Sequence, residues 1–445
     1  MSDIATWYDM ALHAIAAESH FDTHGTVVKA LEAGNNRFFI PGIPESYLRL
    51  VPQQAIAYDA RYTVMQVPND ASGFSGTLIY DKVKGSYILT FRSTEYKDEL
   101  RGGDFQRDVN GADMEINTAG LAFAQIASME RWWAQLTAPG GALAGVAKVE
   151  VVGYSLGGHL AQAFTELHPE VVEHTYLFNS AGLGLQQRGT LADAIDHYRQ
   201  VLANPNHGVL GSETDDTLYR QAIAKAGTPL PTDNLYFDPS HQCAVKETQA
   251  EFGISMPGSP GTVVDNSLIT QLYGHAVHND SEHVANSGVH PETKSIFIED
   301  QPDIEGLIGR LPGLEVTNYL EGKGDFGNTH SLILIIDTLA LEGAFEKFDD
   351  SLSRETIESF LSKASNRTGI GLLLSNGEAE GDSLEKALDA LRRIFVTTDY
   401  VRTESGTAGG SFGDLNFRKP FYDNLAQLET ARAGRSDFRL LPHAA

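Results

Sequence analysis

Residues 149–161 constrain the fold of this chain more than any other segment. They read Val-Glu-Val-Val-Gly-Tyr-Ser-Leu-Gly-Gly-His-Leu-Ala, an apolar β-branched run followed by Gly-x-Ser-x-Gly and a helix-forming stretch. β-branched residues favour a strand, and glycine has no Cβ, so Gly153 and Gly157 let the chain turn sharply into a closely packed helix. The pattern predicts a strand-to-helix turn with Ser155 at its tip in strained geometry and its hydroxyl exposed.

A second segment ends another predicted strand. Residues 86–95 read Ser-Tyr-Ile-Leu-Thr-Phe-Arg-Ser-Thr-Glu. The Gly-x-Ser-x-Gly turn matches the nucleophile elbow of the α/β-hydrolases. With Phe91-Arg92-Ser93-Thr94, the chain resembles the class 3 (fungal-type) lipases and related bacterial secreted lipases, whose strand ends in Phe-Arg-Gly-Ser or Phe-Arg-Gly-Thr. The chain departs from that pattern at Ser93, where the family has glycine.

The resemblance implies a nucleophile and an oxyanion hole. Ser155 would attack the substrate carbonyl, and the backbone N–H groups of Leu156 and Thr94 would stabilise the oxyanion. The Thr94 hydroxyl is an additional donor to consider. Ser93 weakens the match at Thr94, and an ordinary strand end is the alternative there.

The catalytic base is expected beyond the nucleophile, because α/β-hydrolases order their triad as serine, acid, histidine. The chain has 15 histidines, so context must choose. His330 follows a strand-like segment at 314–320 and a polar loop, and it precedes an apolar helix. The resemblance to bacterial secreted lipases implies that His330 is the base. A histidine that caps this helix is the alternative.

The acid is expected just after the preceding strand. Residues 294–299 are strand-like, and Asp303 follows a few positions later, before Ile304. Asp303 is therefore the predicted acid, which fixes the histidine tautomer and stabilises the imidazolium. Asp300 is the first alternative and Asp280 the second.

The segment between Ser155 and Asp303 is far longer than in compact lipases of this kind. Within it, residues 191–202 and 216–226 have helical apolar spacing. We expect residues 185–290 to form a cap or lid insertion that excludes water and shapes an acyl pocket. A surface excursion without a role at the site is the alternative.

The rest of the chain indicates an α/β protein with a helical end. Apolar spacing predicts helices at 4–18 and 118–136, and residues 58–92 read as an antiparallel meander with a hairpin near 82–85. From about residue 345 the pattern is helical. The predicted fold is an α/β-hydrolase catalytic domain over 1–345 and a C-terminal helical appendage over 346–445, with helices at 353–364, 383–395 and 417–433.

Composition limits the partners. The 445 residues are 42% hydrophobic, typical of a globular chain, and carry a formal net charge of −26. Such a charge disfavours nucleic acid and anionic membrane surfaces. Cys243 is the single cysteine, so no intramolecular disulfide forms. No signal peptide or transmembrane run is visible. We expect a secreted protein of bacterial type, with a cytoplasmic one as the alternative; the oligomeric state is not indicated.

Two parts of the chain contain candidate metal ligands. Residues 275–283 contain His275, His278, Asp280, Glu282 and His283, which suit a transition metal. Without cysteines or a His-Glu-x-x-His pattern, a polar loop is the preferred interpretation. No metal ligand is therefore predicted, and no cofactor is required for the chemistry.

A lone calcium site, in the insertion or near Asp108 and Asp113, is the open alternative. Residues 409–414 resemble a single copy of a glycine- and aspartate-containing calcium-binding repeat, but their spacing differs from it, so no such repeat is predicted. His159, four residues after Ser155, is expected to pack on the helix rather than to act in catalysis.

The sequence thus predicts a serine-dependent lipase or esterase that forms an acyl-enzyme on acylglycerol-like esters, with transient contact with a lipid–water interface. Phospholipase A1, polyester hydrolase and acyltransferase activities are alternatives on the same fold. From another class, the chain could be a binding module of a larger surface or toxin-like protein.

Overall fold

The computed structural model describes residues 3–38, 46–66, 70–95, 104–178, 180–184, 186–204, 235–254, 292–296, 332–348, 388–389, 391–393, 396 and 415–433. The chain forms two compact units, and each is described by itself. The sheet unit comprises residues 63–295, and the second unit comprises residues 1–62 with 296–445. The unit boundaries at 62/63 and 295/296 differ from the domain boundary expected near residue 345. The division into catalytic domain and appendage stays a prediction.

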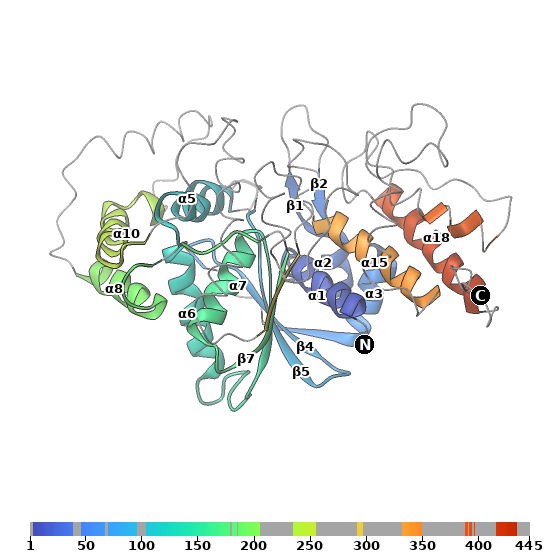
Figure 1. Ribbon diagram of the computed structural model, residues 1–445, viewed down its shortest axis with the longest axis horizontal. Coiled ribbons are helices and arrows are strands. Elements are labelled where there is room, and N and C mark those ends of the chain that lie inside the picture. The colour runs from blue at the N-terminus through green and yellow to red at the C-terminus, as the bar shows by residue number, and fades with distance from the viewer. Residues whose placement is uncertain are drawn as a thin grey trace, which may run out of the picture. The chain divides into compact units, whose positions relative to one another are not determined.

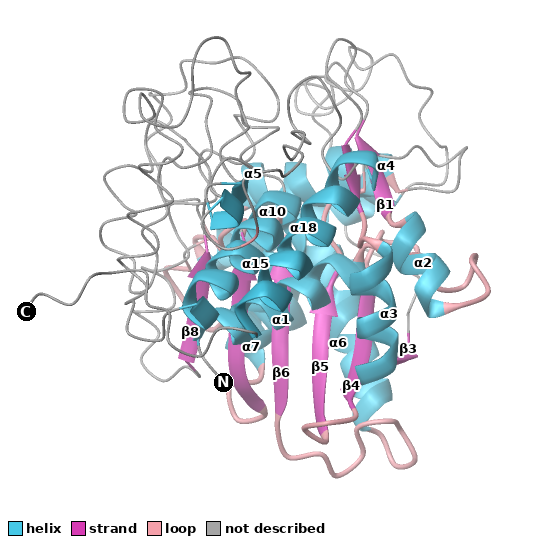
Figure 2. Cartoon of the chain, turned by 90° about the vertical axis from the view of Figure 1, so that its right-hand side faces the viewer, coloured by secondary structure: helices cyan, strands magenta, loops and turns pink. Residues whose placement is uncertain are grey.

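A mixed six-stranded sheet is the centre of the sheet unit, with the strands in the order β3-β4-β5-β6-β7-β8 (Figure 2). The β4 and β5 strands pair antiparallel as the predicted hairpin, and β5, β6 and β7 pair in parallel. The described residues therefore form an α/β fold. The strands are β3 (Tyr62–Gln66), β4 (Gly76–Asp81), β5 (Ser86–Phe91), β6 (Val149–Tyr154), β7 (Val172–Phe178) and β8 (Glu292–Ile296).

Buried apolar side chains hold α6 (Phe123–Thr137) and α7 (Leu156–Leu167) against this sheet (Figure 1). Phe91 of β5, Trp132 of α6 and Phe164 of α7 meet in one aromatic group, with ring centroids 6.0–6.4 Å from the Phe91 ring. Burial of such rings removes large apolar areas from water. The core thus fixes the strand that carries Thr94 relative to the helix that follows Ser155.

The helix expected at 118–136 is two helices. The first, α5 (Met114–Ala119), ends at Gly120, which adopts a left-handed φ of 82°, and α6 begins at Phe123. A Cβ at Gly120 would lie 2.9 Å from the Cα of Gly184, whose N–H donates to the Gly120 carbonyl. The apolar residues keep helical spacing across this break, which is why one helix was predicted. The close contact of the Gly120 and Gly184 backbones requires glycine, and the left-handed Gly120 ends the helix.

The chain before α5 is also helical. It contains α4 (Phe105–Arg107) and the π-helical turn η2 (Asp108–Asp113), which leads directly into α5. A Cβ at Gly111 would lie 2.4 Å from the Tyr236 ring, so glycine permits the close packing of η2 on η3 (Leu235–Phe237). Apolar periodicity gave no signal for η2, because a π-turn does not follow the 3.6-residue repeat.

Two helices of the expected insertion are described. The α8 helix (Leu191–Ala203) confirms the predicted helix at 191–202, and a capping box between Thr190 and Asp193 starts it. Its partner α10 (Pro239–Phe252) begins at the N-cap Asp238 and ends at Gly253. Both helices place apolar side chains in the main core of the sheet unit. The predicted helix at 216–226 lies outside the described residues.

The second unit is mainly helical where it is described. Three helices confirm predictions: α1 that at 4–18, α15 the apolar helix after His330, and α18 that at 417–433. Helix α15 packs on both α1 and α18. Residues 388–389 and 391–393 are helical within the predicted 383–395, and 353–364 lie outside the description. The elements are α1 (Asp3–Ala17), α2 (Val27–Ala33), β1 (Asn35–Phe38), β2 (Ser46–Leu48), α3 (Pro52–Arg61), α15 (Leu332–Phe348) and α18 (Leu415–Ala433).

A buried ion pair joins α15 and α18. Arg418 donates to both carboxylate oxygens of Asp337, at 3.0 and 2.7 Å, and to the Arg49 carbonyl at 2.6 Å. The Tyr422 hydroxyl also donates to Asp337 at 2.7 Å. Burial alone lowers the pKa of Arg418, but the charge and hydrogen bonds of Asp337 raise it above the usual value. Arg418 therefore keeps its charge, and the pair is extensively hydrogen-bonded.

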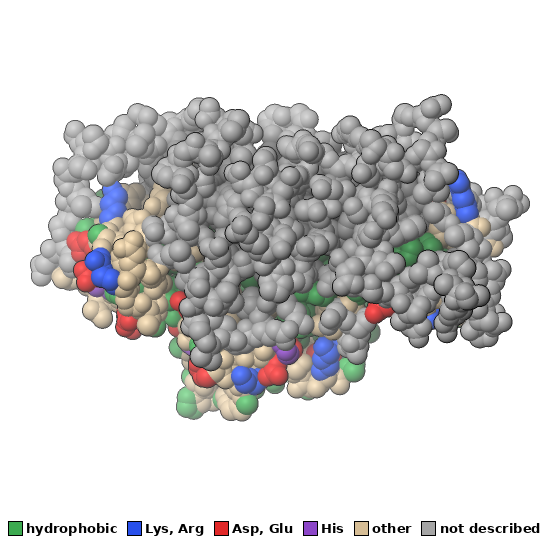
Figure 3. All heavy atoms as spheres, viewed as in Figure 1, with side chains coloured by type: hydrophobic (Ala, Val, Ile, Leu, Met, Phe, Trp, Pro, Cys, Tyr) green, Lys and Arg blue, Asp and Glu red, His purple; other side chains and the backbone are tan. Residues whose placement is uncertain are grey.

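Charges of both signs are interspersed on the described surface of the face shown in Figure 3. Among the described residues, no helix is long and apolar enough to cross a membrane.

Candidate active site

Ser155 lies at a strained turn between β6 and α7. Its φ is 55° and its ψ is −124°. Ser155 is buried, with 2% of its surface exposed, so the exposed hydroxyl predicted from the sequence is not observed. Among the described residues other than glycine, Ser155 alone has a positive φ. A side chain in this region costs about 1–3 kcal/mol and persists only where the surroundings enforce it. Such strain is concentrated at functional sites, so the turn is the first candidate for chemistry.

Three glycines make the turn sterically feasible. A Cβ at Gly153 would lie 2.1 Å from the Gly157 carbonyl oxygen, and one at Gly157 would lie 2.2 Å from the Phe91 carbonyl oxygen. A Cβ at Gly158 would lie 2.4 Å from the Ser180 Oγ. Each distance is far shorter than a carbon–oxygen contact. The glycines therefore let the α7 N-terminus pack directly on the ends of β5 and β6.

Backbone hydrogen bonds hold the strained residue in place. The Ser155 N–H donates to the Phe178 carbonyl at 3.1 Å. The Ser155 carbonyl accepts from Gly158, His159 and Ala181 at 2.9–3.2 Å. The turn is thus tied both to its own helix and to the chain that follows β7.

His159 is buried on α7, which agrees with the packing role expected from the sequence. It is fully buried, and its Nδ1 lies 2.8 Å from the Gly182 carbonyl oxygen. Its Nε2 accepts from the Ala122 N–H at 3.1 Å. A neutral ring with its proton on Nδ1 satisfies both contacts. His159 therefore joins the loops before α6 and after β7 beneath the Ser155 turn.

Thr94, one of the two expected oxyanion donors, lies just beyond the end of β5. Phe91 pairs with Gly153 across the parallel β5–β6 ladder. A Cβ at Gly157 would also meet the Arg92 carbonyl, so the chain leading to Thr94 passes beside the start of α7, where Leu156 lies. The Thr94 hydroxyl donates to Asp113 at 2.9 Å. That hydroxyl is engaged by Asp113, which leaves the backbone N–H as the proposed oxyanion donor.

Several buried carboxylates surround this strand end. Arg92 contacts Asp104 at 3.0 Å and Glu95 at 3.5 Å. Asp108 accepts from the Glu95 N–H at 2.8 Å and from Gln125 at 2.9 Å. Burial raises the pKa of Asp108 well above its usual range, and the Asp104 charge adds to the rise although Arg92 opposes it. The Glu95 backbone, and with it the segment after Thr94, is held by a carboxyl that retains its proton unusually well.

The other expected triad residues lie outside the described part of the chain. These are Asp303, its alternatives Asp300 and Asp280, and His330. Ser155, Asp303 and His330 as a triad therefore stay a prediction. The metal candidates at 275–283 are likewise outside. Among the described residues, no group of three histidine, cysteine or acidic side chains could hold a metal.

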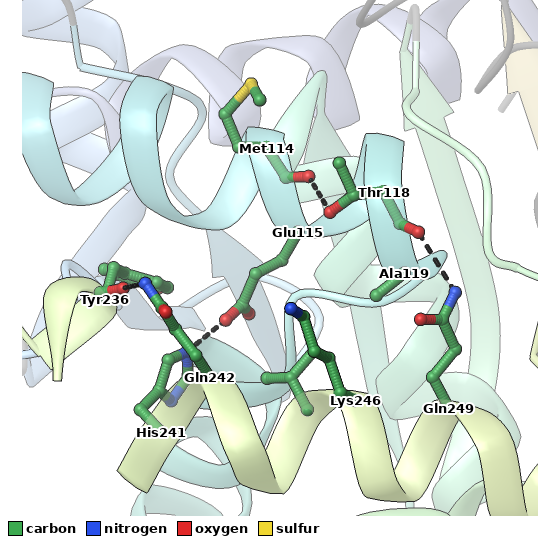
Figure 4. A pocket seen from close by; sticks show the side chains of 10 residues that line it. Met114, Glu115, Thr118, Ala119, Tyr236, His241, Gln242, Lys246 and Gln249 are labelled. Carbon is green, nitrogen blue, oxygen red and sulfur yellow. Dashed lines mark hydrogen bonds and ion pairs between the residues drawn. The ribbon is translucent and has the colours of Figure 1, made fainter. Parts of the chain in front are cut away.

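A cavity of about 360 Å³ lies between α5 and α10 (Figure 4), and no sequence motif predicted it. Glu115 of α5 and His241 of α10 meet at its wall through the His241 Nε2. The His241 Nδ1 lies 2.8 Å from the Tyr198 hydroxyl of α8. These residues are far apart in the sequence and match no motif, so no local signal could have revealed them.

Comparisons with known proteins give weak results. No family model matches the sequence, and no curated protein matches it either. Among solved structures, Lip2 lipase from Yarrowia lipolytica is 14% identical, with 47% of this chain and 67% of the lipase covered and a TM-score of 0.25. A membrane phospholipase A, described as a bacterial virulence factor, is 15% identical, with 56% and 78% covered and a TM-score of 0.19. Identities and TM-scores this low assign neither a family nor a function to this chain.

Proposed function

We propose that this chain is a serine-dependent carboxylic-ester hydrolase with an α/β-hydrolase fold, acting on lipid-like esters such as acylglycerols. The observation that carries the proposal is the turn at Ser155, where a strand enters a helix with a positive φ and three obligatory glycines. Strand, strained serine and helix in this order are the hallmark of a nucleophile elbow. The parallel pairing of β5, β6 and β7 supports the same fold.

The proposed reaction proceeds through an acyl-enzyme. The Ser155 Oγ attacks the ester carbonyl carbon while His330 accepts the hydroxyl proton. The carbonyl oxygen becomes an oxyanion, stabilised by the N–H groups of Leu156 and Thr94. His330 then donates its proton to the departing alkoxide, which leaves as an alcohol. Water, deprotonated by His330, attacks the acyl carbon and releases the carboxylic acid and Ser155.

The remaining features of the proposal are the acid, the cap and the location. Asp303 holds the tautomer of His330, with Asp300 as its competitor. Residues 185–290 act as a cap that supplies an acyl pocket, and 346–445 form a helical appendage. The reaction itself needs no cofactor, and the protein is secreted and meets lipid–water interfaces transiently.

Ester hydrolysis by the purified chain tests this proposal. We expect turnover of p-nitrophenyl butyrate and palmitate and release of oleate from triolein, with phospholipid and polyester as comparison substrates. Ser155→Ala should fold normally and lose about 10⁴-fold or more in kcat. Ser240→Ala, which changes an exposed serine on α10, is the matched control and should leave kcat unchanged. Wild-type protein without hydrolytic activity on any ester would favour a binding role.

The acid is tested by two matched substitutions. Asp303→Asn should lower kcat by about 10⁴-fold, because the imidazole loses the carboxylate that fixes its tautomer. Asp300→Asn should lower it much less. The reverse ranking would replace Asp303 by Asp300 in the proposed triad.

A further inference from the structure

Two consecutive residues just beyond β5 are held by two carboxyl groups of one π-helical turn. The Thr94 hydroxyl donates to the Asp113 Oδ2 at 2.9 Å, and the Glu95 N–H donates to the Asp108 Oδ2 at 2.8 Å. Asp108 and Asp113 are the first and last residues of η2. All four residues are buried. The turn therefore holds the segment that carries the Thr94 N–H at two adjacent points.

The π-helical register of η2 explains how two aspartates five positions apart act on one segment. In an α-helix, residues five apart point about 140° away from each other around the axis. The hydrogen bonds of a π-turn join residues five apart, so these residues lie on the same side. In agreement, the charge of Asp113 contributes to the raised pKa of Asp108, as expected for carboxyl groups that lie close together. An α-helical turn of the same sequence would direct only one of the two aspartates at this segment.

Buried contacts on its other sides keep η2 in this position. The Asp108 Oδ1 accepts from the Gln125 side chain of α6 at 2.9 Å. Gly111, inside the turn, packs on the Tyr236 ring so closely that a Cβ would lie 2.4 Å from a ring carbon. The Tyr236 hydroxyl donates to the Ser72 carbonyl at 2.9 Å. The turn is thus fixed by α6 and η3, independently of the segment that it holds.

The position of the Thr94 N–H matters for the proposed reaction. Oxyanion donors act because they are already aimed at the place where charge develops, and a displacement of about 1 Å can cost on the order of 10²-fold in rate. The parallel β5–β6 ladder ends at the pair of Phe91 with Gly153. Thr94 lies beyond that pair, so the ladder alone does not determine where its N–H points. The contacts from η2 supply the missing constraint.

We propose that Asp108 and Asp113 are positioning residues, which hold the Thr94 N–H in the oxyanion hole through the π-helical register of η2. This inference rests on the proposed ester hydrolysis, because an oxyanion donor has a role only in that reaction. Asp113 acts through the Thr94 hydroxyl, and Asp108 acts through the Glu95 N–H. Neither aspartate touches the substrate. Loss of either contact therefore weakens binding of the transition state and leaves binding of the substrate nearly unchanged.

A double-mutant cycle tests the contact between Thr94 and Asp113, with p-nitrophenyl butyrate as substrate for the full chain. Asp113→Ala and Thr94→Val should each lower kcat by about 30-fold with KM nearly unchanged, as for an interaction realised only in the transition state. The double variant should be no slower than the single variants, because both remove the same contact. Asp113→Asn retains an oxygen that can accept from the Thr94 hydroxyl, so it should recover most of the lost kcat.

The second contact and the control use the same assay. Asp108→Ala should lower kcat by about tenfold with KM unchanged, because the Glu95 N–H loses its acceptor and the segment moves. Asp423→Ala on α18 is the matched control, since it removes a carboxylate that accepts from the Gln53 side chain at 2.5 Å on the surface. This control should keep both kcat and KM.

The results separate this inference from the proposed function. A wild type that hydrolyses esters, with kcat unchanged in Asp113→Ala and Thr94→Val, overturns the positioning role alone. Additive losses in the double variant, or a loss confined to KM, also overturn it. A far larger loss in Thr94→Val than in Asp113→Ala would make the hydroxyl itself the oxyanion donor and contradict the inference.

Two further outcomes are also decisive. A wild type without turnover overturns the proposed function and this inference together. If Asp113→Ala does not fold, Thr94→Val decides the question, because full kcat in that variant overturns the positioning role.

Discussion

The Ser155 turn and the Asp337–Arg418 pair are both buried, but they hold unfavourable features for different reasons. At the turn, a serine is kept at a φ of 55° by backbone hydrogen bonds and by glycines that leave no room for side chains. In the pair, a guanidinium and a carboxylate make two direct hydrogen bonds, and neighbouring groups complete the cluster. The first region stores strain, whereas the second balances charge.

The two regions therefore differ in which substitutions they tolerate. A balanced pair can be replaced as a whole by apolar residues with little loss of stability, as found for other buried ion pairs. At Gly153 and Gly157 the close contacts are with backbone atoms, so no partner side chain could be removed to relieve a clash. Strain that is retained without a structural benefit of its own indicates a role in chemistry.

The largest expected change in stability is at the pair. Arg418→Met should lower the free energy of unfolding by about 4 kcal/mol, because Asp337 is left buried without its cation. The double variant Arg418→Met with Asp337→Leu should recover most of that loss. Urea unfolding followed by circular dichroism measures both. A double variant as unstable as Arg418→Met would show that the pair is not replaceable, and the contrast with the turn would fail.

A substitution at Gly157 of the Ser155 turn should lower stability in a way that no second substitution can repair. Gly157→Ala should lower the free energy of unfolding by about 3 kcal/mol, because its Cβ would overlap the Phe91 carbonyl oxygen. Truncating side chains nearby cannot relieve an overlap with backbone. Gly145→Ala is a useful control, since that glycine has space around it but also a positive φ of 80°. If Gly157→Ala were no worse than Gly145→Ala, the steric account of the turn would be wrong.

The carboxylates beside the turn should make stability depend on pH. The pKa of Asp108 is higher in the folded protein than its ordinary value of 3.8, so the folded state binds the proton more tightly. Its contribution is therefore fully present below about pH 4 and is lost as the pH rises toward the folded pKa. Relative to Asp108→Asn, the wild type should lose up to about 1.4 kcal/mol per pH unit. Urea unfolding of both proteins between pH 4 and 8 measures this difference, and a constant difference would contradict the raised pKa.

The smallest expected change is a gain. Ser155→Gly should raise the free energy of unfolding by about 1 kcal/mol, because glycine adopts the positive φ without strain. The same variant should lose ester hydrolysis. Stability gained together with activity lost would mark the strain as functional. A loss of stability instead would mean that contacts of the serine outweigh its strain.

The features that could be predicted from the sequence are those that local chemistry determines. Gly153, Ser155 and Gly157 predicted a strained turn because a sharp strand-to-helix connection needs residues without Cβ atoms. The break at Gly120 was missed, since it depends on Gly184, far along the chain. The Asp337–Arg418 pair was not predicted, because nothing local in the sequence shows that α15 and α18 bury these two side chains together.

In the candidate site, too, only the residues that belong to local motifs could be predicted from the sequence. Ser155, Leu156 and Thr94 belong to short motifs, whereas Asp303 and His330 were chosen by order along the chain and remain predictions. Glu115 and His241 meet only because α5 and α10 pack together, so periodicity could not have paired them.

Covalent labelling tests the central claim most directly. A p-nitrophenyl alkylphosphonate should react with the native chain and release one equivalent of p-nitrophenol. Peptide mass spectrometry should then locate the phosphonyl group on Ser155, because the probe mimics the tetrahedral intermediate and stays attached to an activated serine. The Ser240→Ala control should be labelled normally. No adduct on Ser155 of the folded protein, or an adduct on another serine, would contradict the assignment of Ser155 as the nucleophile.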